Sequence, residues 1–283
     1  MTSLAQYVVM AHGVAAVLLA WLYFRRFRMV RPPIGVYNLS DIAIMVAAIV
    51  LVPYLYLALP AWMVAGLLLV GTLSILYFTC EPVLPVRWAT WLATATLAGA
   101  DVAAMLAFGP HSTLFFAINN LVLVLTVVGA TNLWVQSGMK ARDAAILGVA
   151  LSIYDFIATW MLPLMDNLFT HVAGLPFTPM VVWPMNGAGL WLGIGLGDLL
   201  MAAAFPLVMR KAFGRPAGIV AILIGLGVLG ILILSPALGL LAKSFPVMIV
   251  LGPLMALQYG YWRRRGEEQT MWQYLQHEPV STG

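Results

Sequence analysis

Apolar stretches of about 20 residues recur along the whole of this 283-residue sequence. A helix needs roughly 20 consecutive, mostly apolar residues to cross the hydrocarbon core of a bilayer, which is about 30 Å thick. Only 8% of the residues are charged, against about 25% in a soluble domain. We therefore predict an all-α polytopic membrane protein with about nine spans, near residues 4–24, 41–60, 61–80, 88–108, 113–135, 143–164, 188–209, 217–235 and 245–262.

The basic residues fall almost entirely on one side of the predicted membrane. Only Lys243 lies on the other side. Cytoplasmic loops carry the excess of Lys and Arg, so we predict an external N-terminus and a cytoplasmic C-terminus. No basic region precedes the first span, which argues against a cleaved signal peptide. The thirteen residues on the cytoplasmic side are Arg25, Arg26, Arg28, Arg31, Arg87, Lys140, Arg142, Arg210, Lys211, Arg215, Arg263, Arg264 and Arg265.

Several classes of function are excluded or made improbable by the remaining composition. A single cysteine, Cys80, cannot form a disulfide framework, and the four histidines are scattered. We therefore expect no metal and no cofactor. The net charge of +4 lies in short loops and indicates topology, not a nucleic-acid partner. The compactness of the whole chain suggests that the protein resides in a prokaryotic plasma membrane. We divide the chain into a helical bundle (1–140), a catalytic group of helices (141–265) and a tail (266–283) that is a surface helix or disordered.

Three of the ten acidic residues lie far from any predicted helix end: Asp101, Asp155 and Asp198. Asp155 is about 11 residues into the sixth span and Asp198 about 10 into the seventh, so each is about 15–17 Å along its helix. On antiparallel helices, both would lie near the midplane. A carboxylate there costs at least about 2.5–3.5 kcal/mol and is a functional candidate. The other seven lie near helix ends or in the tail: Asp41, Glu81, Asp143, Asp166, Glu267, Glu268 and Glu278.

Two facing carboxylates in a medium of low dielectric constant share a proton, because they cannot both ionise easily. One can then activate a water molecule while the other protonates a peptide carbonyl oxygen. Spacing alone favours a different function, a proton- or ion-coupled transporter in which all three aspartates form a relay. For Asp101 we favour a polar contact with Asn119, Asn120 or another span over a role in a proton path.

The residues around the two midplane aspartates change this balance. Tyr154-Asp155 in one span, followed by Gly195-Leu196-Gly197-Asp198 in the next, resembles the presenilin and signal peptide peptidase family of intramembrane aspartyl proteases. The resemblance implies a presenilin-like fold, with Asp155 and Asp198 as the catalytic pair. It also implies that the other four residues of these motifs support the active site or bind substrate.

The glycines before Asp198 have a physical reason of their own. Gly193, Gly195 and Gly197 remove side chains from the backbone, so an extended substrate or a neighbouring helix can approach closely. The alternative is that they are only small residues in a helix–helix contact.

The resemblance continues downstream. Residues 220–226 are similar to the helix that follows in the family. The family's Pro-Ala-Leu motif has two candidates here. A literal Pro236-Ala237-Leu238 lies at the end of the eighth span, whereas Pro246, between Phe245 and Val247, lies at the head of the ninth. Position favours Pro246, because a proline at the start of a helix leaves backbone groups free to bind substrate.

The predicted orientation selects among the family's substrates. An external N-terminus matches signal peptide peptidases, whereas presenilins have a cytoplasmic one. The resemblance thus implies transmembrane substrates with a cytoplasmic N-terminus, including leftover signal peptides. Water must reach the carboxylates, so we expect a polar cavity between spans six and seven. Residues 178–183 are rich enough in β-branched side chains to hold an unwound substrate at a strand edge, although an ordinary loop is the interpretation that we favour.

Other classes fit less well. A transporter predicts inverted repeats, and none is evident. Type IV prepilin peptidases resemble this chain in Gly-x-Gly-Asp, but a basic residue usually follows, where Leu199 stands here. A structural scaffold is the remaining alternative. The sequence therefore predicts an intramembrane aspartic endopeptidase.

Overall fold

The computed structural model describes residues 4–29, 37–84, 86–185, 191–234 and 246–277, and it is mostly helical. In the first half of the chain five long helices follow one another with short connections. Their bounds are α1 Leu4–Arg26, α2 Leu39–Ala58, α3 Ala61–Cys80, α4 Arg87–Phe108 and α5 Thr113–Gln136. These bounds confirm the first five predicted spans, including the corner at Pro60 that separates α2 from α3.

The second half is more broken. Helix α6 is followed directly by a π-helix, η1, and a short helix, α7, precedes a two-stranded antiparallel sheet. Three further helices and a short one in the tail complete the fold. The bounds are α6 Ala141–Asp155, η1 Phe156–Met161, α7 Leu164–Val172, β1 Met180–Pro184, β2 Trp191–Gly195, α8 Leu196–Phe213, α9 Arg215–Leu234, α10 Met248–Arg263 and α11 Met271–His277.

Seven helical segments in the described part of the chain are long and apolar enough to cross a membrane: α1 to α5, the continuous stretch of α6 and η1, and α9. This identifies an integral membrane protein. Two predicted spans fall short of that description. Helix α8 has 18 residues but carries Asp198, Arg210 and Lys211, and α10 has 16 residues. At 1.5 Å per residue α10 is about 24 Å long, less than the roughly 30 Å hydrocarbon core.

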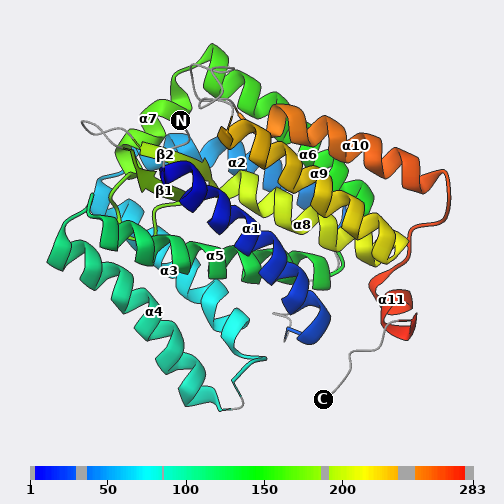
Figure 1. Ribbon diagram of the computed structural model, residues 1–283, viewed down its shortest axis with the longest axis horizontal. Coiled ribbons are helices and arrows are strands. Elements are labelled where there is room, and N and C mark those ends of the chain that lie inside the picture. The colour runs from blue at the N-terminus through cyan, green and yellow to red at the C-terminus, as the bar shows by residue number, and fades with distance from the viewer. Residues whose placement is uncertain (1–3, 30–36, 85, 186–190, 235–245, 278–283) are drawn as a thin grey trace.

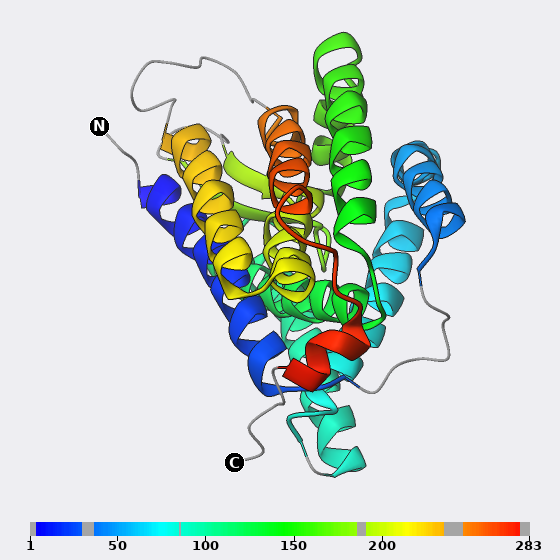
Figure 2. The ribbon, with the colours of Figure 1, turned by 90° about the vertical axis from the view of Figure 1, so that its right-hand side faces the viewer.

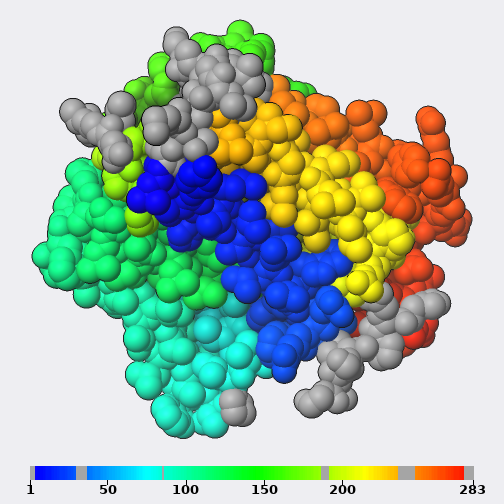
Figure 3. All heavy atoms as spheres, viewed as in Figure 1, coloured from blue at the N-terminus to red at the C-terminus, as the bar shows by residue number. Residues whose placement is uncertain are grey.

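Helices α5 and α8 form the centre of the bundle. Helix α8 is buried almost all the way round from Leu199 to Ala212, as expected of a helix that is apolar on every face. Helix α5 packs against α1, α3, α4, α8 and β1. In Figure 1 these central helices run between the sheet at one end and the tail helix α11 at the other. In Figure 3 the space-filling view shows α1, α9 and α10 covering the face toward the viewer.

Helix α2 lies at the periphery. Only Ile42 and Pro53 are buried among its residues, and it packs mainly against α6 and α7. Figure 2 shows α2 beside α3 on one side of the molecule, with α6 between them and α10. A helix with so little buried surface is free to present most of its apolar side chains to lipid.

Three predictions about the second half are wrong in detail. The fold is not all-α, because the segment between α7 and α8 forms the two-stranded sheet. The favoured interpretation of residues 178–183 as an ordinary loop fails for the same reason, since Met180–Pro184 is strand β1. The predicted seventh span begins too early, because α8 starts at Leu196. Gly193 and Gly195 disfavour a helix there, and residues 191–195 pair with β1 as a strand instead.

In the described part of the tail, residues Met271–His277 form helix α11, which agrees with the first of the two predicted states. Helix α11 packs against α8, and Met271 and Tyr274 are buried. The ring of Tyr274 stacks on Phe24 near the end of α1 at a centroid distance of 5.5 Å. The tail is therefore part of the packed structure at the end of the bundle where α1, α8 and α10 terminate. The division of the chain at residues 140 and 265 stays a prediction.

Candidate functional site

Asp155 is the last residue of α6 and stands directly before the π-helix η1. Such π-helical turns are rare and are frequent at functional sites. Pro163 follows within a few residues and cannot donate a backbone hydrogen bond, so the regular helix has no continuation here. The chain therefore changes its helical geometry where the candidate catalytic carboxylate is attached.

Asp198 occupies the first turn of α8, whose N-terminal cap is Gly195. The prediction that it lies in mid-helix is wrong, because the preceding residues are extended and pair with β1. A carboxylate in the first turn also stabilises a helix through its dipole, so this position alone does not identify a catalytic group. Its Oδ2 atom lies 3.5 Å from where a Cβ on Gly195 would stand. The carboxylate thus folds back over the motif's first glycine.

The two aspartates are brought together by the packing of α6 against α8. Both side chains are half-buried, and the charge of Asp155 acts on the carboxyl group of Asp198. Two neighbouring carboxyl groups in a medium of low dielectric constant favour a state that holds one proton between them. This is the arrangement that acid–base catalysis by a pair of aspartates requires.

The start of α10 completes the surroundings of Asp155. The backbone amide of Met248 lies beside the Asp155 carboxylate, and the Ser152 hydroxyl donates to the Met248 carbonyl oxygen at 2.6 Å. Pro246 and Val247, immediately before, are buried. Of the two Pro-Ala-Leu candidates, the Pro246 region therefore lies beside a candidate catalytic residue. Phe245 and Pro236-Ala237-Leu238 lie outside the described residues.

Sequence reasoning missed how α10 approaches α6 so closely. A Cβ on Gly252 would overlap the backbone of Gly148 and the Ser152 hydroxyl. A Cβ on Gly148 would lie 3.1 Å from the Met255 sulfur. Small residues four apart on a membrane helix are a recognised sign of close helix contact, so Gly148 and Ser152 carried a usable signal.

The three glycines before Asp198 differ in their surroundings. Gly193 lies within the sheet, where a Cβ would be 3.1 Å from the Val181 carbonyl oxygen, so close strand pairing explains it. Gly197 is exposed, with nothing within 4 Å of an added Cβ. Gly195 and the intervening Leu196 are half-buried. Within the described part of the chain, Gly197 is therefore the one of these three glycines whose small size no contact explains.

Tyr154 faces a cleft between α2 and α6. Its hydroxyl is buried and has no hydrogen-bond partner among the described residues. The cleft has a volume of about 370 Å³ and an almost wholly apolar lining. It is lined by Val46, Val50 and Tyr54 of α2, by Ala150, Ile153 and Tyr154 of α6, and by Ile157, Ala158, Leu162 and Leu164. The polar cavity expected between spans six and seven stays a prediction.

The outer edge of strand β1 is closed by Asn120 of α5. The amide nitrogen of Asn120 donates to the Val182 carbonyl oxygen at 2.9 Å, and its Oδ1 accepts from the Val182 amide at 3.0 Å. These Val182 groups therefore point away from β2. In an antiparallel pair the opposite residue, Gly193, then directs its own N–H and C=O to the outer edge of β2. Within the described residues no third strand pairs with that edge.

Asp101 lies apart from the other two aspartates. Its Oδ2 accepts a hydrogen bond of 2.7 Å from the Phe177 amide. Phe177 has a φ of 60°, a left-handed conformation that costs energy for a bulky residue. The predicted polar contact is therefore present, although its partner is the segment before β1, and neither Asn119 nor Asn120. The side-chain amide of Asn119 binds the same segment, since it donates a hydrogen bond of 3.4 Å to the Thr178 carbonyl oxygen.

Comparison with known proteins adds no assignment: no family model matches the chain, and no curated protein matches it in sequence.

Proposed function

We propose that this protein is an intramembrane aspartyl protease that cleaves peptide bonds within transmembrane segments. One observation carries the proposal: Asp155 at the end of α6 and Asp198 at the start of α8 lie on helices that pack against each other, close enough for their charges to interact. The resemblance of their motifs to the presenilin and signal peptide peptidase family implies that the reaction is peptide-bond hydrolysis by a pair of aspartates.

The reaction follows from one shared proton. The ionised carboxyl group removes a proton from water, which attacks the scissile carbonyl carbon, while the protonated one donates to the carbonyl oxygen. Collapse of the tetrahedral intermediate then breaks the C–N bond and returns a proton to the leaving amine. Because the pair titrates as one unit, neither residue is assigned permanently as acid or base.

The outer edge of β2 is the place where an unwound substrate would bind. A transmembrane helix buries its carbonyl groups in its own hydrogen bonds and must unwind before it is cleaved. The outward N–H and C=O groups of Gly193 can pair with an extended chain, as in other cases of strand addition. This edge leads directly to Asp198, whereas Asn120 blocks the edge of β1, which the sequence had offered only as an alternative to an ordinary loop.

The apolar cleft between α2 and α6 suits the part of the substrate that remains helical. It adjoins Tyr154, the neighbour of Asp155, and its lining matches the apolar side chains of a transmembrane segment. Since α2 buries few of its residues, it can be displaced at small cost in packing.

We further propose nine spans in a presenilin-like fold, with α8 and α10 counted as spans. Both would be shielded from lipid by their neighbours, so they need less length and hydropathy than an isolated span. The charge distribution then places the N-terminus outside, and the preferred substrates have a cytoplasmic N-terminus. If the purified protein in liposomes cleaved only substrates of the opposite orientation, this preference would be wrong.

The catalytic pair is tested with purified protein and a fluorogenic transmembrane peptide. We expect Asp155→Asn and Asp198→Asn each to abolish cleavage, while Asp166→Asn, an exposed aspartate of α7, leaves it unchanged. A peptide isostere bearing a hydroxyl group mimics the tetrahedral intermediate and should inhibit. Cleavage that survives either of the first two substitutions excludes the pair.

A coupled transporter remains the alternative. It requires proton transfer among all three aspartates. The Asp101 carboxylate instead accepts a hydrogen bond from the Phe177 amide, in the segment before β1, which favours the protease. Proton uptake by proteoliposomes under an imposed gradient would support transport.

A further inference from the structure

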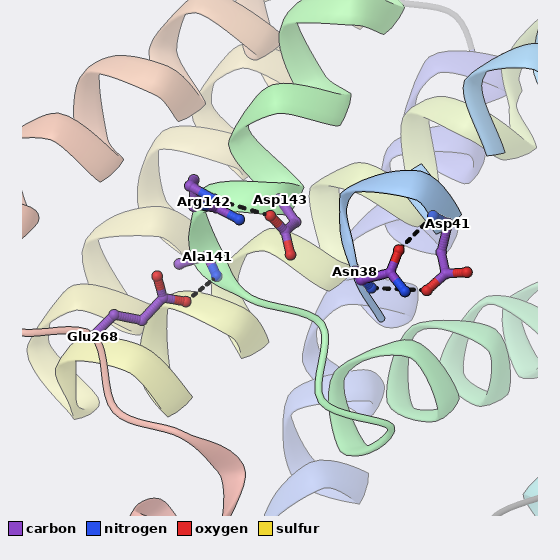
Figure 4. Close-up of polar contacts among 6 residues, drawn as sticks. All are labelled: Asn38, Asp41, Ala141, Arg142, Asp143 and Glu268. Carbon is purple, nitrogen blue, oxygen red and sulfur yellow. Dashed lines mark hydrogen bonds and ion pairs between the residues drawn. The ribbon is translucent and has the colours of Figure 1, made fainter. Parts of the chain in front are cut away.

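Two adjacent residues of the tail bind the ends of both helices that carry the candidate catalytic aspartates. The Glu268 carboxylate accepts a hydrogen bond of 2.5 Å from the Ala141 amide, in the first turn of α6. Figure 4 shows this contact beside the Arg142–Asp143 ion pair, with the Asn38–Asp41 capping box of α2 nearby. The amide of the next residue, Gln269, donates to the Ala212 carbonyl oxygen in the last turn of α8 at 3.0 Å.

Helix α6 needs this contact because its own cap position cannot provide it. Lys140 stands at the N-cap and makes no side-chain capping bond, since an ammonium group has no acceptor. The first amides of a helix have no partner within it and attract negative charge. Glu268 thus supplies from 127 residues away the carboxylate that a local Ser, Thr, Asn or Asp normally supplies.

The two contacts lie at matched distances from the aspartates. Asp155 follows Ala141 by 14 residues, and Ala212 follows Asp198 by 14 residues. At 1.5 Å per residue both intervals are about 21 Å of helix. Glu268 and Gln269 have Cα atoms only about 3.8 Å apart, so they hold the ends of two antiparallel helices at nearly the same height. Because the start of α6 and the end of α8 lie at the same level along the helix axes, the carboxyl groups of Asp155 and Asp198 also lie at one level.

We propose that Glu268 and Gln269 form a register clamp, which sets the axial position of α6 relative to α8 and so brings Asp155 and Asp198 level. Glu268 is a positioning residue in this proposal and touches neither substrate nor water at the reacting carbon. The catalytic consequence rests on the proposed function, whereas the positions of the helices do not.

Other contacts at this end of the bundle anchor the clamp. Tyr274 and Met271 are buried on the protein side of α11, and Tyr274 stacks on Phe24. The Lys211 ammonium donates to the Met139 carbonyl oxygen and ties the end of α8 to the connection before α6. Helix α11 therefore fixes the tail just after the two clamping residues, and the Lys211–Met139 bond fixes the two helix ends that they join.

The clamp is tested by measuring the distance between the two helix ends directly. Spin labels are introduced at two exposed positions next to these ends, Lys140→Cys at the N-cap of α6 and Arg215→Cys two residues after α8. Cys80→Ser removes the native thiol, and the distance is followed by pulsed electron resonance in liposomes. We expect Glu268→Ala to widen the distance distribution and shift its mean. Glu268→Gln, which keeps an acceptor oxygen for Ala141, should restore it, and Glu267→Ala, which alters an exposed neighbour, should have no effect.

A second pair of variants tests the α8 contact without removing a charge. Gln269→Pro deletes the amide that binds Ala212 and should widen the distribution, whereas Gln269→Ala keeps that amide and should not. In peptide cleavage, Glu268→Ala and Gln269→Pro should lower kcat at least about tenfold with KM nearly unchanged, because misplaced catalytic groups slow the reaction without altering the substrate site.

An unchanged distance distribution in both Glu268→Ala and Gln269→Pro would overturn the clamp. A changed distribution with unaltered kcat would overturn its role in catalysis. If the unsubstituted protein cleaves no peptide, the proposed function fails, while the distance measurement still decides whether the tail sets the helix register.

Discussion

The hydroxyl of Ser152 in α6 donates a hydrogen bond of 2.6 Å to the carbonyl oxygen of Met248, the first residue of α10. This bond joins the start of α10 to the end of α6 and places the Met248 amide beside the Asp155 carboxylate. A backbone amide beside a carboxylate helps to orient it. The orientation of Asp155 therefore depends on how closely α10 approaches α6, which is set by the glycines at 148 and 252.

Gly252→Ala tests this dependence. The added Cβ would overlap Gly148 and the Ser152 hydroxyl, so the helices must separate. We expect a destabilisation of roughly 1–3 kcal/mol and a marked loss of peptide cleavage, measured by thermal unfolding in detergent and by the fluorogenic assay. Gly260→Ala is the matched control, since nothing lies within 4 Å of its Cβ. Unaltered stability in Gly252→Ala would show that the two helices are not in close contact.

Gly197→Ala separates a role in substrate binding from a role in folding. No atom of the residues that the structure describes lies within 4 Å of the added Cβ, so the unfolding temperature should stay within about 2 °C of the original, which corresponds to less than about 1 kcal/mol. If substrate passes over this surface, KM should nevertheless rise severalfold, because the methyl group occupies space that the substrate needs. Full activity with unaltered KM would mean that substrate does not approach Gly197.

Asn120→Leu opens the edge of β1. The substitution leaves the Val182 amide and carbonyl without their partners, and each unsatisfied buried group costs about 1–3 kcal/mol. We expect a lower unfolding temperature and slower cleavage, because β2 loses the support of its only strand neighbour in the described residues. Asn119→Leu, which removes one long bond to Thr178, should have a smaller effect. Equal effects of the two would argue against the bidentate contact.

Asp101→Asn distinguishes a structural carboxylate from a proton carrier. The amide oxygen can still accept from the Phe177 amide, but the side chain can no longer exchange a proton. We expect activity close to the original and stability within about 1 kcal/mol, whereas Asp101→Leu should cost about 1–3 kcal/mol. Loss of activity in a stable Asp101→Asn protein would instead place Asp101 in a proton path.

How far the sequence could predict the site depends on the range of the contacts involved. Tyr154-Asp155 and Gly195-Leu196-Gly197-Asp198 were found as local motifs, and Pro246 was chosen over Pro236 by its place relative to a span. The partner of Asp101 was missed, because the Phe177 amide becomes available only when the segment before β1 takes its left-handed turn. The role of Glu268 was also missed, since a glutamate in a polar tail looks the same whether it is solvated or caps a helix.

The sequence by itself determined that this is a membrane protein built of apolar helices, because the free energy of removing so much apolar surface from water depends on composition and periodicity alone. Only the tertiary structure decided that residues 191–195 form a strand, that Asp198 begins a helix, and that Glu268 and Met248 reach α6. Glycine-rich segments have little preference of their own, so pairing across the sheet decides their conformation. Contacts between helices distant in sequence depend on packing shape, which no local pattern encodes.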